Sequence, residues 1–246
     1  GNAAKQGVPV CVYSLEMSRE QLIFRMLGQI ADVEPSKITK GTATEEEMRA
    51  LEEASRQLKE LPICINQRSD IQIDEIRCDI SLRRRQGKCS LAIDYLQLVN
   101  RDDKGQTPNE AISNITRKAK ITAMDEEIPI VLLCQLNRNC ETRGTYSFRH
   151  QLSDLRDSGS IEQDADTVAF ISRLSVVNIH EDPDTHLPTR GRGTILLAKN
   201  RQGELGHVRF MHNEGVTSFW DDTQPACVRK ARAAEPKPKG KGLFEC

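Results

Sequence analysis

The sequence predicts an α/β fold, in which a mostly parallel sheet has helices on both faces and an antiparallel edge near the C-terminus. Nearly continuous apolar runs, typical of parallel strands buried on both faces, alternate with amphipathic helical segments in the first part of the chain. After residue 150 short strands follow one another through turns, which indicates antiparallel pairing. The predicted strands cover residues 8–14, 62–66, 89–98 and 128–136, and then 167–172, 193–199, 206–211 and 217–220.

Signals for the starts and stops of helices place the helices between these strands. Ser18 with Gln21, and Thr44 with Glu47, have the spacing of capping boxes, in which two side chains satisfy free N–H groups at a helix start. Gly87 is a typical residue for ending a third helix. The predicted helices begin at residues 18 and 44 and cover residues 73–86 and 109–127. A hairpin turn is expected at 202–206, and residues 2–7 resemble the end of a further helix.

Length and composition favour one domain. The 246 residues suffice for a single α/β core, which we assign to residues 1–222. Residues 223–246 are rich in Lys, Arg, Ala, Pro and Gly, and we expect a disordered basic tail there. A formal net charge of -1 argues against a generally basic surface, although not against a local basic channel. An aromatic content of 4% argues against a base-stacking surface.

The cysteines and the hydropathy pattern indicate a cytoplasmic protein. None of the eight cysteines forms a CxxC pair, and four of them lie in predicted strands, which is typical of free thiols in a reducing compartment. No apolar run reaches membrane-spanning length, and no signal peptide opens the sequence. We therefore expect no membrane partner.

Three predicted strands end in residues that can act on a bound ligand, namely Glu16, Asp94 and Gln135. Ligands of open α/β sheets bind beyond the carboxyl ends of the strands. An Asp that closes an apolar strand is the Walker B pattern, whose carboxylate helps to hold Mg²⁺ beside nucleotide phosphates. Taken singly, Asp94 would be interpreted as a turn cap, and Glu16 could simply be a solvated residue before the helix at Ser18. Together, the three residues predict a water-orienting base, a metal ligand and a phosphate sensor.

Five segments resemble, in the same order, the motifs of DnaB-type replicative DNA helicases. Several motifs in the right order are far more specific than a single match. The resemblance spans residues 8–221 and implies a RecA-like fold and an ATP-driven motor that unwinds duplex DNA while moving 5′ to 3′ on single-stranded DNA. The segments are residues 13–18 (Tyr-Ser-Leu-Glu-Met-Ser), 93–98 (Ile-Asp-Tyr-Leu-Gln-Leu), 135–138 (Gln-Leu-Asn-Arg), 153–166 and 198–203 (Ala-Lys-Asn-Arg-Gln-Gly).

The resemblance implies ATP and Mg²⁺ as cofactors and gives roles to single residues. Glu16 resembles the catalytic glutamate, Asp94 the metal-binding Walker B aspartate and Gln135 the phosphate sensor. Lys199 and Arg201 resemble the pair that reaches a neighbouring subunit's nucleotide, which requires an oligomer, and the family forms a homo-hexameric ring. Without that context, Lys199 and Arg201 would be interpreted as a solvated turn.

The resemblance also predicts contacts with single-stranded DNA. Arg156, Asp157 and Gly159 match the loop that the family presents to DNA in the ring channel, and Arg138 would add positive charge. An Arg side chain or a Gly backbone N–H can bind phosphate without reading the base sequence, as a translocating motor requires. The alternative is that Asp157 only caps the helix that follows.

The largest departure from the family is an absence. No phosphate-binding loop of the form Gly-x-x-x-x-Gly-Lys-Ser/Thr occurs in the sequence, so we expect a truncated chain that alone binds ATP poorly and does not hydrolyse it. The family's N-terminal collar domain, which contacts primase, is also absent, and ring formation by this chain stays open. Asp157 stands where the family more often has Glu, and Ser172 stands where the family usually has an aromatic residue. Primase and a helicase loader are the implied protein partners.

Two alternatives remain open. A RadA/RecA-like recombination ATPase would share the fold, although the Ser-Leu-Glu-Met segment and residues 153–166 favour the helicase. A non-catalytic, helicase-derived module that binds DNA or helicase subunits would explain the missing loop.

Overall fold

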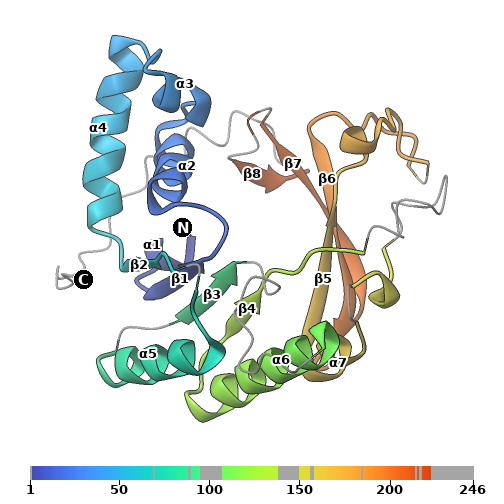
Figure 1. Ribbon diagram of the computed structural model, residues 1–246. Helices are drawn as coiled ribbons and strands as arrows, with labels where there is room; N and C mark the ends of the chain where they lie inside the picture. The colour runs from blue at the N-terminus through green and yellow to red at the C-terminus, as the bar shows by residue number, and fades with distance from the viewer. Residues whose placement is uncertain are drawn as a thin grey trace.

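The computed structural model consists of two four-stranded sheets with helices around them (Figure 1). For residues 90–94, 108 and 158 the backbone alone is described. The predicted basic tail at 223–246 lies outside the described residues. The structure describes residues 2–68, 70–87, 90–94, 107–137, 150–155, 158–183, 185–213, 215 and 218–222.

The first sheet is parallel and has the order β2-β1-β3-β4. In its centre, Cys11 of β1 lies opposite Cys64 of β2 on one side and Leu91 of β3 on the other. Parallel strands need long crossover connections, which the helices supply. The strands are β1 (Val10–Ser14), β2 (Ile63–Asn66), β3 (Ser90–Asp94) and β4 (Ile130–Leu132).

The helices of the first part begin where the capping signals predict. Ser18 and Thr44 each cap a helix, and each forms its capping box with the residue three positions on. The predicted stop at Gly87 is confirmed, because this glycine has φ 72°, a left-handed value that side chains disfavour. The short helix α3 was not expected from the sequence. The helices are α1 (Asn2–Lys5), α2 (Arg19–Ala31), α3 (Pro35–Lys40), α4 (Glu45–Lys59), α5 (Ile73–Arg85) and α6 (Pro108–Asp125).

The second sheet is antiparallel and has the order β5-β6-β7-β8. The predicted hairpin between β6 and β7 is confirmed. A short helix, α7 (Ser158–Asp164), precedes this sheet. The strands are β5 (Thr167–Ser172), β6 (Arg192–Asn200), β7 (Gly206–His212) and β8 (Phe219–Asp221), and the 3-10 helices are η3 (Leu152–Asp154) and η4 (Leu174–Val177).

The predicted parallel strands and the antiparallel strands near the C-terminus are confirmed, but they form two sheets and not one. Among the described residues, β4 and β5 are the edge strands of two separate sheets and share no ladder (Figure 1). The predicted strand at 128–136 shrinks to the three residues of β4. Its end leaves the sheet because Leu136 forms an isolated antiparallel bridge with Leu155, and the Asn137 N–H donates to the Asp154 carbonyl oxygen at 2.7 Å.

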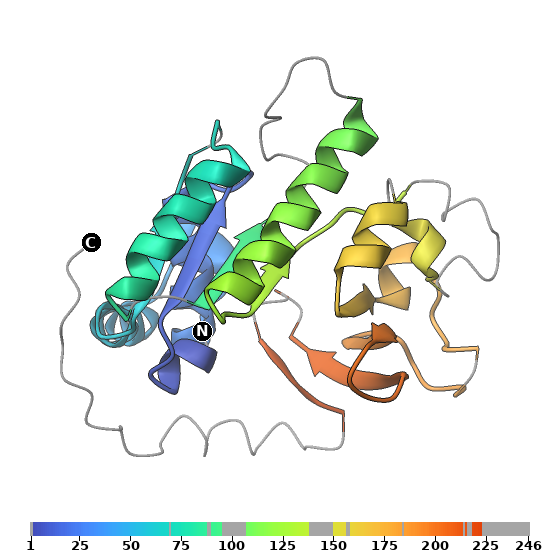
Figure 2. The same cartoon turned by 90° about the horizontal axis from the view of Figure 1, so that it is seen from below.

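Helices cover the two faces of the parallel sheet unequally. Figure 2 shows α5 and α6 side by side over one face. On the other side, α2, α3 and α4 stand over β1 and β2 (Figure 1). The face of β4 that points away from the core is open, because Val131 and Leu133 are 53% and 50% exposed. The prediction of covered faces therefore holds for β1 and β2 but not for β4.

One hydrophobic core joins the two sheets. Cys11 of β1 and Ile76 of α5 are both fully buried, and they belong to the same cluster as Ile115 of α6, Ile161 of α7 and Phe170 of β5. The strands and helices around the core therefore hold the carboxyl ends of β1, β3 and β4 in a fixed relation. No described helix has both the length and the apolar composition that crossing a membrane requires.

A buried polar network ties β1 to α5. The Tyr13 hydroxyl donates to the Asp79 carboxylate, which also accepts from Arg83 Nε at 2.9 Å. Tyr13 is 1% exposed. Burial raises the pKa of Tyr13 above its ordinary value, and the nearby Asp79 carboxylate adds to the shift. The folded protein therefore keeps this phenol neutral.

This network predicts a specific loss of stability at high pH. Unfolded tyrosine ionises near pH 10, whereas folded Tyr13 does not, so the free energy of unfolding should fall as the pH rises above about 10. One such group lowers it by about 1.4 kcal/mol per pH unit. Urea unfolding between pH 8.5 and 11 would measure the slope, and Tyr13→Phe should flatten it. Equal slopes for the two proteins would show that Tyr13 ionises in the folded state.

Candidate nucleotide site at the strand ends

The carboxyl ends of β1 and β3 lie side by side. Ser14, the last residue of β1, is in register with Asp94, the last residue of β3. Neighbouring strands are about 4.8 Å apart, so the Asp94 backbone is one strand spacing from the turn that carries Glu16. On the other side of β3, Ile93 is opposite Leu132 at the end of β4. The ends of β1, β3 and β4 therefore lie together at one edge of the sheet. The Asp94 side chain lies outside the described atoms.

Glu16 sits on a tight turn between β1 and α2. The buried Ser14 hydroxyl donates to the Met17 carbonyl oxygen at 2.7 Å, which closes the turn around Glu16. The Ser18 cap then starts α2 at once, and the Arg19 N–H donates to Gln67 Oε1 at 2.9 Å. The Glu16 side chain is exposed and has no hydrogen bond or ion pair within the described part of the chain. The fold thus fixes its backbone and leaves its carboxylate available.

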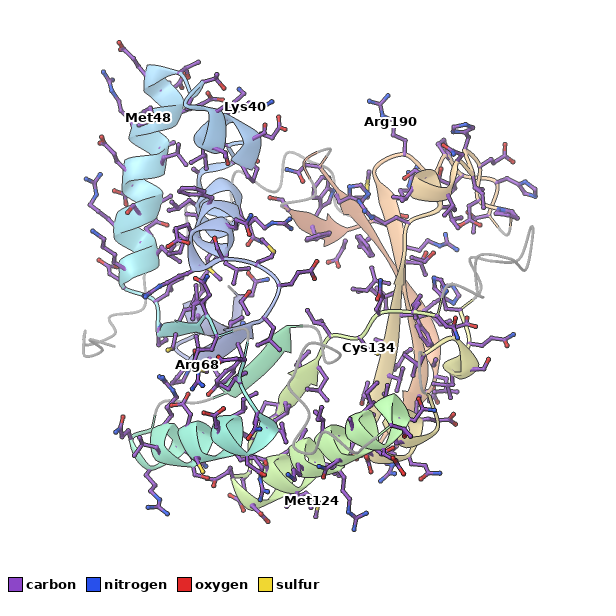
Figure 3. All side chains as sticks on the ribbon, in the orientation of Figure 1. Lys40, Met48, Arg68, Met124, Cys134 and Arg190 are labelled. Atoms are coloured by element: carbon purple, nitrogen blue, oxygen red, sulfur yellow. The ribbon has the colours of Figure 1, made fainter. Side chains whose placement is uncertain are left out.

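Gln135 follows β4 on the segment that crosses to the second sheet. In Figure 3 the preceding residue, Cys134, lies on this segment between the two sheets. Gln135 is exposed, and the chain after it is fastened by the Leu136–Leu155 bridge. The segment after Gln135 is therefore tied to Leu155, the residue that follows η3.

The donors at these strand ends suit the metal half of a nucleotide site. Among the described side chains, no group of three or more His, Cys, Asp or Glu residues could hold a metal ion. Mg²⁺ in phosphoryl-transfer sites takes one or two protein carboxylates and completes its shell with water and phosphate oxygens. Asp94 at a strand end, beside an exposed Glu16, fits that pattern. The residues that would cradle the phosphates are absent from the sequence.

Lys199 and Arg201 do not lie free in solvent as a simple turn would leave them. The Lys199 ammonium donates to the carbonyl oxygen of Glu162, and Arg201 Nη2 donates to that of Gln163 at 2.6 Å. Both acceptors are in the last turn of α7, where helix carbonyls lack N–H partners and the helix dipole favours cations. The structure therefore brings both predicted residues to one place, at the end of α7.

Asp166 joins the same group of charges. Its Oδ2 lies 2.5 Å from Lys120 Nζ of α6, and its Oδ1 lies 3.8 Å from Arg201 Nη1. The hydrogen bond from Lys120 lowers the pKa of Asp166, and the charges of Lys120, Arg201 and Lys199 act in the same direction. We call Lys120, Asp166, Lys199 and Arg201 the α7-end cluster.

The predicted DNA-binding residues are described only in part. Gly159 lies in the first turn of α7, where a Cβ would meet nothing within 4 Å. Arg138, Arg156 and Asp157 lie outside the described residues, as does the alternative role of Asp157 as a cap.

Comparison with known proteins decides the family. The family model described as "DnaB-like helicase C terminal domain" matches residues 1–221. The chain belongs to this DnaB-like family. It is 34% identical over 219 residues to the replicative DNA helicase DnaB of Geobacillus stearothermophilus, covering 88% of this chain and 46% of that protein. It thus spans about half the length of this relative.

Solved structures show the same relation to the DnaB-like family. A DnaB-like replicative helicase, studied with its interactions with primase, has a TM-score of 0.81 and 27% identity over 89% of this chain and 52% of that one. A second solved structure, of an ATPase domain, has a TM-score of 0.80 and 27% identity, and covers 89% of this chain and 76% of that one. The two sheets therefore have the arrangement of a RecA-like ATPase domain of the DnaB type.

Some residues at the candidate site are not singled out by the sequence alone. Ser14 belongs to the quoted Ser-Leu-Glu-Met segment, but its hydroxyl's role in closing the turn follows from the structure. Asp166 ends the 153–166 segment, yet no sequence signal joins it to Lys120, which is 46 residues away.

Proposed function

We propose that this chain is the ATP-dependent motor part of a replicative DNA helicase, which unwinds duplex DNA while translocating 5′ to 3′ on single-stranded DNA. The observation that carries the proposal is that Asp94, the last residue of β3, lies opposite Ser14, the last residue of β1, two residues before Glu16. A base and a metal ligand one strand apart are what hydrolysis of a phosphoanhydride needs, because catalysis there is mostly positioning and charge stabilisation.

Each residue of the strand-end site has a separate task. The exposed Glu16 carboxylate accepts a hydrogen bond from the attacking water and orients it toward the terminal phosphate. Asp94 would hold Mg²⁺, which when bound neutralises charge on the nucleotide phosphates. Gln135 contacts the terminal phosphate and passes its presence or loss to the segment fastened at Leu136 and Leu155.

The α7-end cluster acts between subunits. Lys199 and Arg201 reach the nucleotide of a neighbouring subunit in a homo-hexameric ring and stabilise the charge that develops on its phosphates. Both side chains remain partly exposed, as contact with another subunit requires. Arg156, Asp157, Gly159 and Arg138 bind the phosphates of single-stranded DNA in the ring channel. Among the described residues, neither packing nor backbone conformation demands glycine at position 159, which supports this role.

Protein partners follow from the same assignment. A DnaB-like helicase of known structure was solved in the context of its interactions with primase, and we propose primase and a helicase loader as partners of the full assembly.

The deciding experiment supplies the missing loop. We define the loop-restored protein as this chain joined at its N-terminus to a phosphate-binding segment of the family type. We expect the loop-restored protein to hydrolyse ATP, to be stimulated by single-stranded DNA, and to unwind forks with a 5′ tail but not a 3′ tail. The chain without the added segment is the control, and it should show no turnover.

A folded but inactive loop-restored protein would contradict the motor assignment. The second candidate is a non-catalytic, helicase-derived module that binds DNA or helicase subunits. Retained DNA binding without turnover would support that module.

A further inference from the structure

Arg201 is held by its own subunit through both terminal nitrogens of its guanidinium. Nη2 donates to the Gln163 carbonyl oxygen at 2.6 Å, and Nη1 lies 3.8 Å from Asp166 Oδ1. The backbone N–H of Arg201 also donates to the backbone carbonyl oxygen of Asp166 at 2.9 Å, so these two residues are fixed side by side. A bidentate grip on a phosphate uses two guanidinium N–H groups at once. Contacts within the subunit therefore compete with contact to a neighbour's nucleotide.

The Asp166 carboxylate is divided between two cations. Lys120 Nζ lies 2.5 Å from Asp166 Oδ2, whereas Arg201 Nη1 lies 3.8 Å from Asp166 Oδ1. The side chains of Asp166 and Arg201 are 51% and 50% exposed, so water weakens but does not remove these attractions. Without Lys120, the Asp166 carboxylate would attract Arg201 alone and bind it more strongly. Without the charge of Asp166, Arg201 would lose this attraction.

We propose that Asp166 is a positioning residue that holds Arg201 against α7 of its own subunit, and that Lys120 limits this hold so that Arg201 can leave for a neighbour's nucleotide. The inference rests on the proposed function for the role of Arg201, but the hold itself is a property of the single chain. It predicts effects of opposite sign for substitutions at the two partners of one ion pair. A purely structural role for the pair would instead make both substitutions act in the same direction.

The hold can be measured without ATP hydrolysis, on the chain as it exists. Phenylglyoxal modifies accessible guanidinium groups, and mass spectrometry after digestion gives the rate at Arg201. We expect Asp166→Asn to raise this rate about two- to fivefold, the range that partly exposed ion pairs allow, and Lys120→Met to lower it. An unchanged rate in Asp166→Asn, or a rise in Lys120→Met, would overturn the proposal.

The same helix offers a matched control pair. Lys118 Nζ lies 2.6 Å from Asp74 Oδ2, with exposures of 21% and 54% that resemble those of Lys120 and Asp166. Asp74→Asn and Lys118→Met should leave the Arg201 rate unchanged. Arg83 on α5 serves as the reference in each digest, because its side chain is only 21% exposed and unfolding would raise its modification together with that of Arg201. A rise at Arg201 alone supports the hold, whereas a change of Arg201 reactivity in the control pair counts against it.

Turnover of the loop-restored protein tests the second half of the proposal. Asp166→Asn should raise kcat, Lys120→Met should lower it, and Asp166→Glu should restore the original value. If Arg201 reactivity shifts as expected but kcat does not follow, Asp166 positions Arg201 while the finger assignment fails. If the loop-restored protein shows no turnover, the proposed function fails, and the reactivity measurement still decides the hold.

Discussion

Glu16→Gln is expected to slow ATP hydrolysis by the loop-restored protein by a factor of about 10² to 10⁴, the usual contribution of a positioned base. Glutamine keeps the size of the side chain but cannot take a proton from the attacking water. The turn that presents this residue is closed by the Ser14 hydroxyl and the Ser18 cap, neither of which involves the Glu16 carboxylate. The loss should therefore appear in kcat, with ATP binding little changed.

The stability of Glu16→Gln separates a catalytic from a structural cause. The exposed Glu16 side chain has no partner among the described residues. The thermal midpoint of the Glu16→Gln protein should therefore match that of the parent protein. Glu52→Gln makes the same chemical change at an exposed position on α4 and should retain full turnover. A Glu16→Gln protein that is folded and still active would remove Glu16 from the mechanism.

Arg201→Ala is expected to lower turnover of the loop-restored protein by a factor of about 10³ to 10⁵, the range measured for arginine fingers. Without the guanidinium, charge that develops on the neighbouring subunit's phosphates loses its counter-charge. Arg56→Ala, which removes an exposed arginine from α4, is the matched control and should leave turnover unchanged.

Mixing two inactive variants tests whether Arg201 acts between subunits. In a ring containing both Glu16→Gln and Arg201→Ala subunits, a subunit with intact Glu16 can receive Arg201 from a Glu16→Gln neighbour. Random assembly would restore up to about a quarter of the interfaces. Turnover in the mixture, absent from each variant alone, would establish supply in trans. No recovery in a mixed ring verified by native mass spectrometry would place Arg201 at its own subunit's site.

The local elements were predictable because their signals are local. A capping box depends on residues three positions apart, so Ser18 and Thr44 mark their helices before any tertiary contact is known. The continuous apolar runs around Cys11 and Leu91 likewise predict buried parallel strands, and the register confirms that these strands are neighbours.

The predicted strand at 128–136 is wrong beyond Leu132. Its composition is apolar throughout, but composition does not say where a ladder stops. The ladder ends at Leu132, and Leu136 pairs instead with Leu155 outside the sheet. Competition between two long-range pairings decided the outcome, and neither pairing is visible in a window of the sequence.

The sequence likewise determines some features of the candidate site, and only the tertiary structure decides the others. The sequence by itself determined the residue types at the strand ends, because Glu16, Asp94 and Gln135 each follow a recognisable apolar run. It also determined the family, since motif order is a property of the chain alone. The tertiary structure decided that Lys120 and Arg201 share the carboxylate of Asp166. The physical reason is that hydrogen bonds and ion pairs act over a few ångströms in space, and the packing of α6, α7 and β6 brings together residues that lie 46 and 35 positions apart.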